Sequence, residues 1–170
     1  MRYQKKKLFV DMDGTIAELR TKEEYDAGVN FSELPPYDEV LTAVKEIVEL
    51  YNDEIEVYIL SAYEKGNREA LRQKNRWLDR WLPEVKHRIF IHCGDSKADA
   101  FAGIDSDCFL LDDYNVNLKA WEEKSGTAIK LVNGVNSFSC VKNCVHKDTD
   151  ADAIVCGILE AMNYLDDCVA

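Results

Sequence analysis

The chain has 170 residues, of which 46% are hydrophobic, and it carries a formal net charge of −11 at pH 7. This composition indicates one globular domain over residues 1–170 with a sizeable core, and it excludes an intrinsically disordered chain. No apolar run approaches the length of a membrane-spanning helix, and the acidic balance argues against broad binding of nucleic acid.

The first predicted element is a buried strand over residues 8–10, and two carboxylates follow it. Asp11 and Asp13 stand at i and i+2, and Gly14 and Thr15 come next, which indicates a sharp turn where the strand ends. In an open parallel sheet, chemistry sits at this end of the strands. Two like charges buried side by side need a cation or a proton between them, so the pair is a candidate site. The alternative is a strand followed by an ordinary Asp-Gly turn.

The segment before this strand is basic, but the apolar stretch that follows is interrupted by Asp11 after three residues. It therefore lacks the hydrophobic region of a secretory signal peptide. This pattern predicts a cytoplasmic location.

A polar insert follows the first strand, over about residues 18–36. It is too short for an independent domain and contains the Pro35-Pro36 break, so it predicts a loop or a small helical cap. It must emerge over the strand ends, where a bound molecule would lie. Tyr25 and Phe31 within it could each stack on an aromatic base, or could instead pin the insert to the core.

The rest of the chain alternates between helical and strand patterns, which predicts an α/β sheet with right-handed crossovers. The predicted helices cover residues 40–51, 71–82, 118–126 and 153–165, and the predicted strands cover residues 57–62, 89–94, 108–112 and 127–132.

The predicted helix before Pro83 lies in a basic stretch of an otherwise acidic chain. We interpret this stretch as a solvated helix face, because charged helix faces are common. The functional alternative is that Lys65 or Arg68, the members closest to Ser61, reaches a substrate. The other basic residues of the stretch are Arg72, Lys74, Arg76, Arg80, Lys86 and Arg88.

Two cysteines and a histidine near the C-terminal end, Cys140, Cys144 and His146, have a spacing that fits no common zinc pattern. A structural zinc ion needs four ligands, and Cys156 would have to supply the fourth from within a helix. We interpret the segment as a surface loop, with a zinc site as the alternative.

Four predicted strands end in polar residues of complementary chemistry. The first ends in Asp-x-Asp, the next in Ser61, the third is followed by Lys97, and the fourth ends in Asp112-Asp113. Parallel strands bring all four ends to one edge of a sheet. An acidic cluster there suits a hard divalent cation, and Ser and Lys suit the oxygens of a phosphoryl group.

The order of these residues resembles the four-motif signature of the haloacid dehalogenase superfamily of phosphohydrolases, and the resemblance extends over about residues 8–133. Within the superfamily, residues 110–115 together with the early Asp-Met-Asp-Gly look most like the 5′(3′)-deoxyribonucleotidase group. The resemblance implies a three-layer, Rossmann-like parallel sheet with a short cap insert after the first strand.

The resemblance also implies roles for the motif residues. Asp11 would be the nucleophile that forms an aspartyl-phosphate, and Asp13 would be the general acid and base. Ser61 would donate its hydroxyl to a phosphoryl oxygen, and Lys97 would pair with Asp11 and the phosphate. Thr15 could donate a hydrogen bond near the loop.

A magnesium ion would bind the Asp11 carboxylate, the Asp13 backbone carbonyl and Asp113. Asp112 would stand behind them and orient a water ligand, although the roles of Asp112 and Asp113 could be reversed.

These expectations describe a magnesium-dependent phosphomonoesterase that acts on a small phosphorylated substrate, with a nucleoside monophosphate as the leading candidate. One alternative is a phosphatase for another small ester or for a phosphorylated nucleic-acid end. The other is a catalytically silent binding module that kept the fold.

Overall fold

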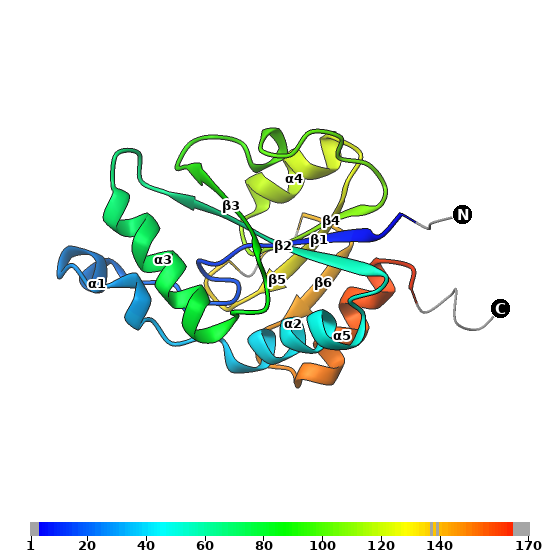
Figure 1. The fold of residues 1–170 in the computed structure, drawn as a ribbon, viewed down its shortest axis with the longest axis horizontal. Coiled ribbons are helices and arrows are strands. Elements are labelled where there is room, and N and C mark those ends of the chain that lie inside the picture. The colour runs from blue at the N-terminus through cyan, green and yellow to red at the C-terminus, as the bar shows by residue number, and fades with distance from the viewer. Residues whose placement is uncertain (1–3, 137, 139, 165–170) are drawn as a thin grey trace.

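A six-stranded, all-parallel sheet forms the centre of the computed structural model, which describes residues 4–136, 138 and 140–164 (Figure 1). Its strand order is β3-β2-β1-β4-β5-β6. The strands are β1 (Lys6–Val10), β2 (Ile55–Tyr63), β3 (His87–His92), β4 (Cys108–Asp112), β5 (Thr127–Val132) and β6 (Asn143–His146). The helices are α1 (Lys22–Asp26), α2 (Asp38–Leu50), α3 (Arg68–Trp81), α4 (Asn115–Glu123) and α5 (Ala151–Ala161), with 3₁₀ turns η1 (Phe31–Glu33) and η2 (Lys97–Asp99).

Strand β1 is buried on both faces because it lies between β2 and β4. Its Phe9 stands level with Tyr58 of β2 and with Leu110 of β4. Successive side chains of a strand point to opposite faces, so Leu8 and Val10 join one hydrophobic cluster and Phe9 joins the other. This arrangement explains the unbroken apolar run that precedes Asp11 in the sequence.

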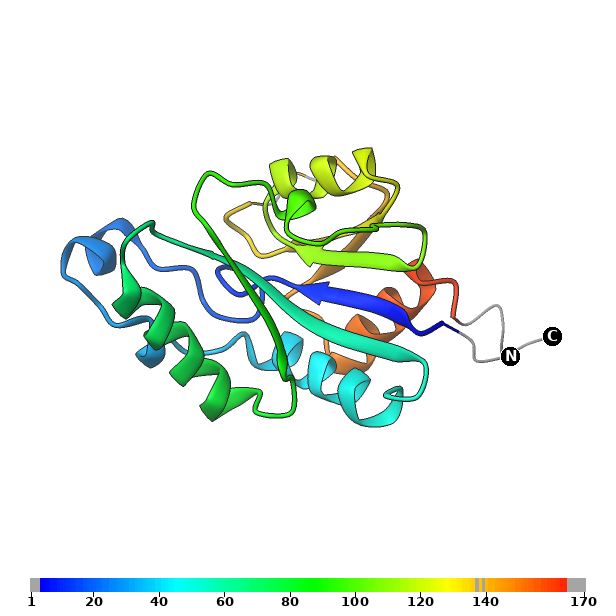
Figure 2. The same ribbon diagram turned by 45° about the horizontal axis from the view of Figure 1, so that its top comes forward.

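Helices cover both faces of the sheet and give three layers (Figures 1 and 2). On one face α2 and α5 pack against each other, and α3 contributes Trp77 and Leu78 to the same cluster. On the other face α4 packs over β4 and β5 through Leu118 and Trp121. The predicted α/β fold class, a three-layer Rossmann-like parallel sheet, is confirmed. Among the described residues, no helix has the length and apolarity to cross a membrane.

The prediction of a surface loop around Cys144 is wrong, because residues 143–146 form β6, a parallel edge strand beside β5. Only Val145 of this strand is buried, so its apolar signal was too weak to detect. Within the described part of the chain, no group of metal-ligating atoms gathers around Cys140, Cys144 and His146, which argues against the zinc alternative.

The last predicted helix is shorter than expected. Helix α5 starts two residues before residue 153, where the Asp150 side chain accepts a hydrogen bond from the Ala153 backbone N–H at 2.8 Å. It ends at Ala161, and the predicted end at Leu165 lies outside the described residues. The other predicted helices and strands lie within a few residues of the observed ones.

Candidate active site

The candidate site lies where the strand order reverses, between β1 and β4. Ligands of open α/β sheets bind at the carboxyl ends of the strands beside such a switch point. Asp11 directly follows β1, and its backbone N–H donates to the Leu111 carbonyl of β4 at 3.0 Å. Asp112 is the last residue of β4 and Asp113 follows it. The topology therefore brings the first and fourth predicted motifs together.

Three carboxylates meet at this point. Oxygens of Asp11, Asp112 and Asp113 all lie within 4.8 Å of one another, and all three residues are buried. Lys97 of η2 reaches into the group, with its Nζ 2.5 Å from Asp11 Oδ1 and 2.6 Å from Asp112 Oδ2. The predicted pairing of Lys97 with Asp11 is present in this arrangement.

Burial controls the electrostatics of the group. Loss of hydration is the main cause that raises the pKa of Asp11 to about 6. The charge of Lys97 lowers this pKa, whereas the charges of Asp112 and Asp13 raise it further. Burial also raises the pKa of Asp113, although hydrogen bonds from Asn136 and Asn133 oppose the shift. For Lys97 burial alone would lower the pKa, but the carboxylates of Asp11 and Asp112 raise it above its usual value.

Asp112 is fully buried and tightly held. Its Oδ1 accepts the Tyr114 backbone N–H at 2.7 Å, and its Oδ2 accepts from Asn117 at 2.9 Å as well as from Lys97. Asp113, by contrast, lines a cavity that Asp11 and Lys97 also line.

Asparagines that follow β5 hold Asp113 in place. Asn133 Nδ2 and Asn136 Nδ2 donate to Asp113 Oδ2 at 2.8 and 2.6 Å. Asn133 Nδ2 also donates to the Gly14 carbonyl at 2.8 Å and so ties the loop after β1 to Asp113. Gly14 has a φ of +74°, and a Cβ there would lie 2.7 Å from Asp113 Oδ2, so only glycine fits without a shift.

Asp13 lies with residues of β2 and α3 rather than with the acidic group. Ser61 Oγ donates to Asp13 Oδ2 at 3.2 Å. Lys74 of α3 also donates to Asp13 Oδ2, and its Nζ lies 2.9 Å from Ser61 Oγ. Lys74 is 3% exposed, whereas the Asp13 side chain keeps 35% of its surface. On the other side of the loop, Thr15 Oγ1 donates to Asp11 Oδ2 at 3.4 Å.

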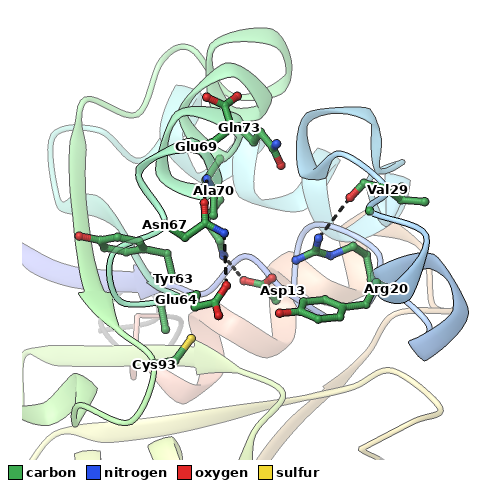
Figure 3. A pocket seen from close by; sticks show the side chains of 14 residues that line it. Asp13, Arg20, Val29, Tyr63, Glu64, Asn67, Glu69, Ala70, Gln73 and Cys93 are labelled. Atoms are coloured by element: carbon green, nitrogen blue, oxygen red, sulfur yellow. Dashed lines mark hydrogen bonds and ion pairs between the residues drawn. The ribbon is translucent and has the colours of Figure 1, made fainter.

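Two adjoining cavities open at these residues, and both are lined by Asp13, Ala62 and Cys93. The smaller, of about 290 Å³, contains Asp11, Lys97 and Asp113. The larger, of about 470 Å³, extends toward the insert and α3. Figure 3 shows Asp13 between Arg20 of the insert and the Glu64 and Asn67 side chains that precede α3. Asp13 thus stands at the boundary between the two cavities.

The fold matches solved structures of hydrolases. A haloacid dehalogenase-like family hydrolase from Streptococcus pneumoniae aligns with a TM-score of 0.61 at 8% identity, over 88% of this chain and 97% of its own. A D,D-heptose 1,7-bisphosphate phosphatase from Burkholderia thailandensis aligns with a TM-score of 0.59 at 16% identity, over 91% and 99% of the two chains. The chain has the fold of the haloacid dehalogenase-like hydrolases.

A further structure with this haloacid dehalogenase fold is a D,D-heptose 1,7-bisphosphate phosphatase from B. bronchiseptica complexed with magnesium and phosphate. It aligns with a TM-score of 0.56 at 16% identity, over 91% of this chain and 98% of its own. No protein-family model and no curated protein matches the sequence. The similarity therefore concerns the fold, and the site of this chain must be understood from its own residues.

The insert of this haloacid dehalogenase fold presents its two aromatic residues differently. Phe31 is 1% exposed, and its ring packs 6.5 Å from the ring of Trp77 on α3. Tyr25 is 56% exposed and lines the larger cavity, with the Arg20 guanidinium 5.1 Å from its ring centroid. Tyr25 therefore faces the space beside Asp13, and Phe31 holds the insert to the core.

Sequence reasoning missed two features of this site. The prediction of a solvated helix face is wrong at Lys74, which is buried beside Asp13, whereas Lys65 and Arg68 are exposed and line neither cavity. Its spacing of three residues from Leu71 and four from Leu78 placed it on the apolar face of the helix, and that signal could have found it. The two asparagines that hold Asp113 were also missed. They follow the predicted strand over residues 127–132. Because binding residues gather at the carboxyl ends of parallel strands, this position could have identified them.

Proposed function

We propose that this protein is a magnesium-dependent phosphomonoesterase that works through an aspartyl-phosphate intermediate. The observation that carries the proposal is the convergence of Asp11, Lys97 and Asp113 on one cavity, with Asp13 at its boundary. A phosphoryl group in this cavity would meet a carboxylate nucleophile and a cation on one side. Its ester oxygen would point past Asp13 toward the larger cavity.

The reaction has two steps that reuse the same residues. An Asp11 carboxylate oxygen attacks phosphorus, the bond to the ester oxygen breaks, and protonated Asp13 gives its proton to the leaving oxygen. Asp13 then takes a proton from a water molecule that attacks the same phosphorus, and the bond to Asp11 breaks. The products are an alcohol and inorganic phosphate, and both carboxyl groups return to their starting state.

The acidic group fits a divalent cation, because three buried carboxylates lie within 4.8 Å of one another and burial raises the pKa of Asp11 and Asp113. Magnesium would be held by the Asp11 carboxylate, the Asp13 carbonyl and Asp113, with Asp112 orienting a water ligand. Such an ion would neutralise phosphoryl oxygens and so assist attack by an anionic nucleophile. The saturated hydrogen bonding of Asp112 supports this division of roles.

Lys97 and Ser61 would bind the phosphoryl oxygens. Lys97 can do so from its present position, because its Nζ already lies beside the nucleophile at 2.5 Å. The Ser61 hydroxyl donates to Asp13 in this geometry, so binding a phosphoryl oxygen requires the hydroxyl to rotate. Neither residue changes its charge during the two steps.

We assign a nucleoside monophosphate as the substrate, because the larger cavity offers both stacking and hydrogen bonding next to Asp13. The exposed Tyr25 supplies an aromatic face, and the amides of Asn67 and Gln73 supply donors and acceptors. The carboxylates of Glu64 and Glu69 also line this cavity and favour a second candidate, a phosphate ester of another polyhydroxylated compound. A phosphorylated nucleic-acid end is the third candidate.

Hydrolysis of p-nitrophenyl phosphate with magnesium, and its loss with EDTA, tests the activity and its metal requirement. Phosphate release from a panel that contains dUMP, dTMP, a 3′-monophosphate, sugar phosphates and a 3′-phosphorylated oligonucleotide then tests the substrate. The strongest release is expected from a nucleoside monophosphate. A folded protein that releases no phosphate from any of these compounds would instead support the silent binding module.

Replacing Tyr25 and Phe31 separately with Ala is expected to give different defects. Loss of stacking by Tyr25 lowers kcat/KM for the best nucleotide about tenfold and leaves p-nitrophenyl phosphate hydrolysis unchanged, since that ester does not extend to the insert. Loss of Phe31 lowers the free energy of unfolding by about 3–5 kcal/mol, because its ring is buried against Trp77.

Steady-state kinetics with both substrates and urea denaturation measure these two effects. Equal losses for the two substrates in Tyr25→Ala, with unchanged stability, would mean that the residue supports the catalytic loop and does not select the leaving group.

A further inference from the structure

A buried lysine that the two-step reaction does not use lies on the leaving-group side of Asp13. Lys74 is 3% exposed and stands in α3 among the apolar positions that face the core. Burying an ammonium group is unfavourable unless it is paired, and an apolar side chain at such a position is often as stable or more stable. The presence of a lysine here therefore points to a role other than stability.

The ammonium group of Lys74 is fixed by three neighbours. It donates to Asp13 Oδ2 and to Ser61 Oγ, and it lies 4.5 Å from the ring centroid of Phe31 in the insert. A cation over an aromatic face is attracted by the ring, most strongly where water is excluded. Lys74 therefore contacts the Asp-x-Asp loop, the Ser61 strand and the insert at once.

Neighbouring positions of α3 hold the insert in the same place. Gln73 Oε1 accepts the Phe31 backbone N–H at 2.9 Å, and Trp77 Nε1 donates to the Leu34 carbonyl at 2.8 Å. Both contacts lie within one helical turn of Lys74. The helix thus fixes the distance between the insert, which bounds the larger cavity, and Asp13.

Hydrogen bonding at Asp13 is asymmetric. Oδ2 accepts from both Lys74 and Ser61, whereas among the described residues no donor contacts Oδ1. Oδ1 is therefore the oxygen that remains available to carry the proton that Asp13 transfers. A carboxyl group whose one oxygen is held by two donors cannot rotate freely, so the other oxygen keeps a fixed direction.

We propose that Lys74 is a positioning residue that holds Asp13 by Oδ2 and so directs Oδ1 at the leaving oxygen. This inference rests on the proposed phosphatase function and deepens it. Lys74 lines the larger cavity and not the smaller one that would hold the phosphoryl group, so we assign its effect on the reaction to its contact with Asp13. Removal of Lys74 should therefore slow proton transfer to the leaving group and leave the rate of attack by Asp11 unchanged.

The test compares two aryl phosphates that differ by one nitro group and whose leaving groups differ in their need for a proton. The p-nitrophenolate ion leaves readily without one, whereas the phenolate of phenyl phosphate depends more on general acid catalysis. Lys74→Met keeps an unbranched side chain in the core and removes the ammonium group. Its kcat for phenyl phosphate is expected to fall about tenfold more than its kcat for p-nitrophenyl phosphate, with KM little changed for either.

Three further variants calibrate the result. Asp13→Asn should show the same preference for p-nitrophenyl phosphate in a stronger form, because it removes the acid itself. Lys65→Met, a change at an exposed lysine just before α3, should behave like wild type. Lys74→Gln keeps a donor of similar reach without the charge, and it is expected to recover part of the phenyl phosphate kcat.

The outcomes separate this inference from the function on which it rests. A wild-type protein that releases no phosphate from these esters or from any compound of the substrate panel would overturn the proposed function. If wild type is active, an equal loss on both esters in Lys74→Met, or no loss, would overturn the positioning role. Circular dichroism checks the fold of each variant. If Lys74→Met does not fold, the ratio of the two kcat values in Lys74→Gln decides the question in the same way.

Discussion

Replacing Asp11 with Asn is expected to reduce phosphate-ester hydrolysis to the background rate. The amide keeps the size of the carboxylate but is a poor nucleophile, so the covalent step has no attacking group. The other site residues keep their partners, because Lys97 stays paired with Asp112 at 2.6 Å and Asp113 stays bound to Asn133. The variant should therefore still bind inorganic phosphate weakly.

The stability of this variant gives a second readout. Burial raises the pKa of Asp11 from 3.8 to about 6, so the folded protein binds this proton more tightly than the unfolded chain does. Ionised Asp11 then opposes folding increasingly as the pH rises from about 4 to 6, and it continues to do so above that range. An uncharged Asn avoids this penalty but gives up one of the two ion pairs of Lys97. The two effects oppose each other, and a melting temperature close to that of wild type is expected at neutral pH.

Phosphate release from p-nitrophenyl phosphate and scanning calorimetry measure the two effects. Asp11→Glu is a useful companion, because it keeps the charge and moves it by one methylene group. Near-normal hydrolysis by Asp11→Asn would remove the basis for the proposed function, since Asp11 is the carboxylate of the group that both lines the smaller cavity and pairs with Lys97.

The strand-end residues could be predicted from sequence because a parallel sheet leaves little freedom in where they lie. Once β1 and β4 are adjacent, Asp11 and Asp113 must meet at the same edge, and the loop after β3 must bring Lys97 to the same region. Lys74 could not be placed by the same rule, because its position depends on the phase of a helix. Leu71 and Leu78 indicate that phase, but the many basic residues around Lys74 favoured the interpretation as a solvated face.

Strand β6 and the insert show a second limit of prediction from the sequence. An edge strand that buries only Val145 produces almost no hydrophobic pattern, so the sequence offered nothing to distinguish it from a loop. In the insert, Tyr25 and Phe31 belong to segments with no sustained periodicity. Which of them faces the cavity depends on where α3 lies, through contacts such as that of Phe31 with Trp77.

Replacing Asp112 and Asp113, the adjacent acids of the fourth motif, separately with Asn is expected to give two different defects. Asp113 lines the cavity with Asp11, so Asp113→Asn should weaken magnesium binding strongly and raise the magnesium concentration needed for activity. Asp112 is fully buried and accepts from Lys97, Asn117 and the Tyr114 backbone. Asp112→Asn removes one partner of a buried cation, and the expected loss of stability is about 3–5 kcal/mol.

Isothermal titration calorimetry measures the magnesium affinity of the two variants, and urea denaturation measures their stability. Neither measurement needs an activity assay. Asp113→Asn should lose most of the magnesium affinity and little stability, because Asn133 and Asn136 can reorient toward an amide. Asp112→Asn should lose stability, and its magnesium affinity should fall by about 10–100-fold at most, as expected for a residue that only orients a ligand. The matched control is Asp148→Asn, an exposed acid whose side chain retains 80% of its surface, and it should change neither quantity. Equal magnesium affinity in wild type and Asp113→Asn, with a strong loss in Asp112→Asn, would reverse the two assignments and make Asp112 the direct ligand.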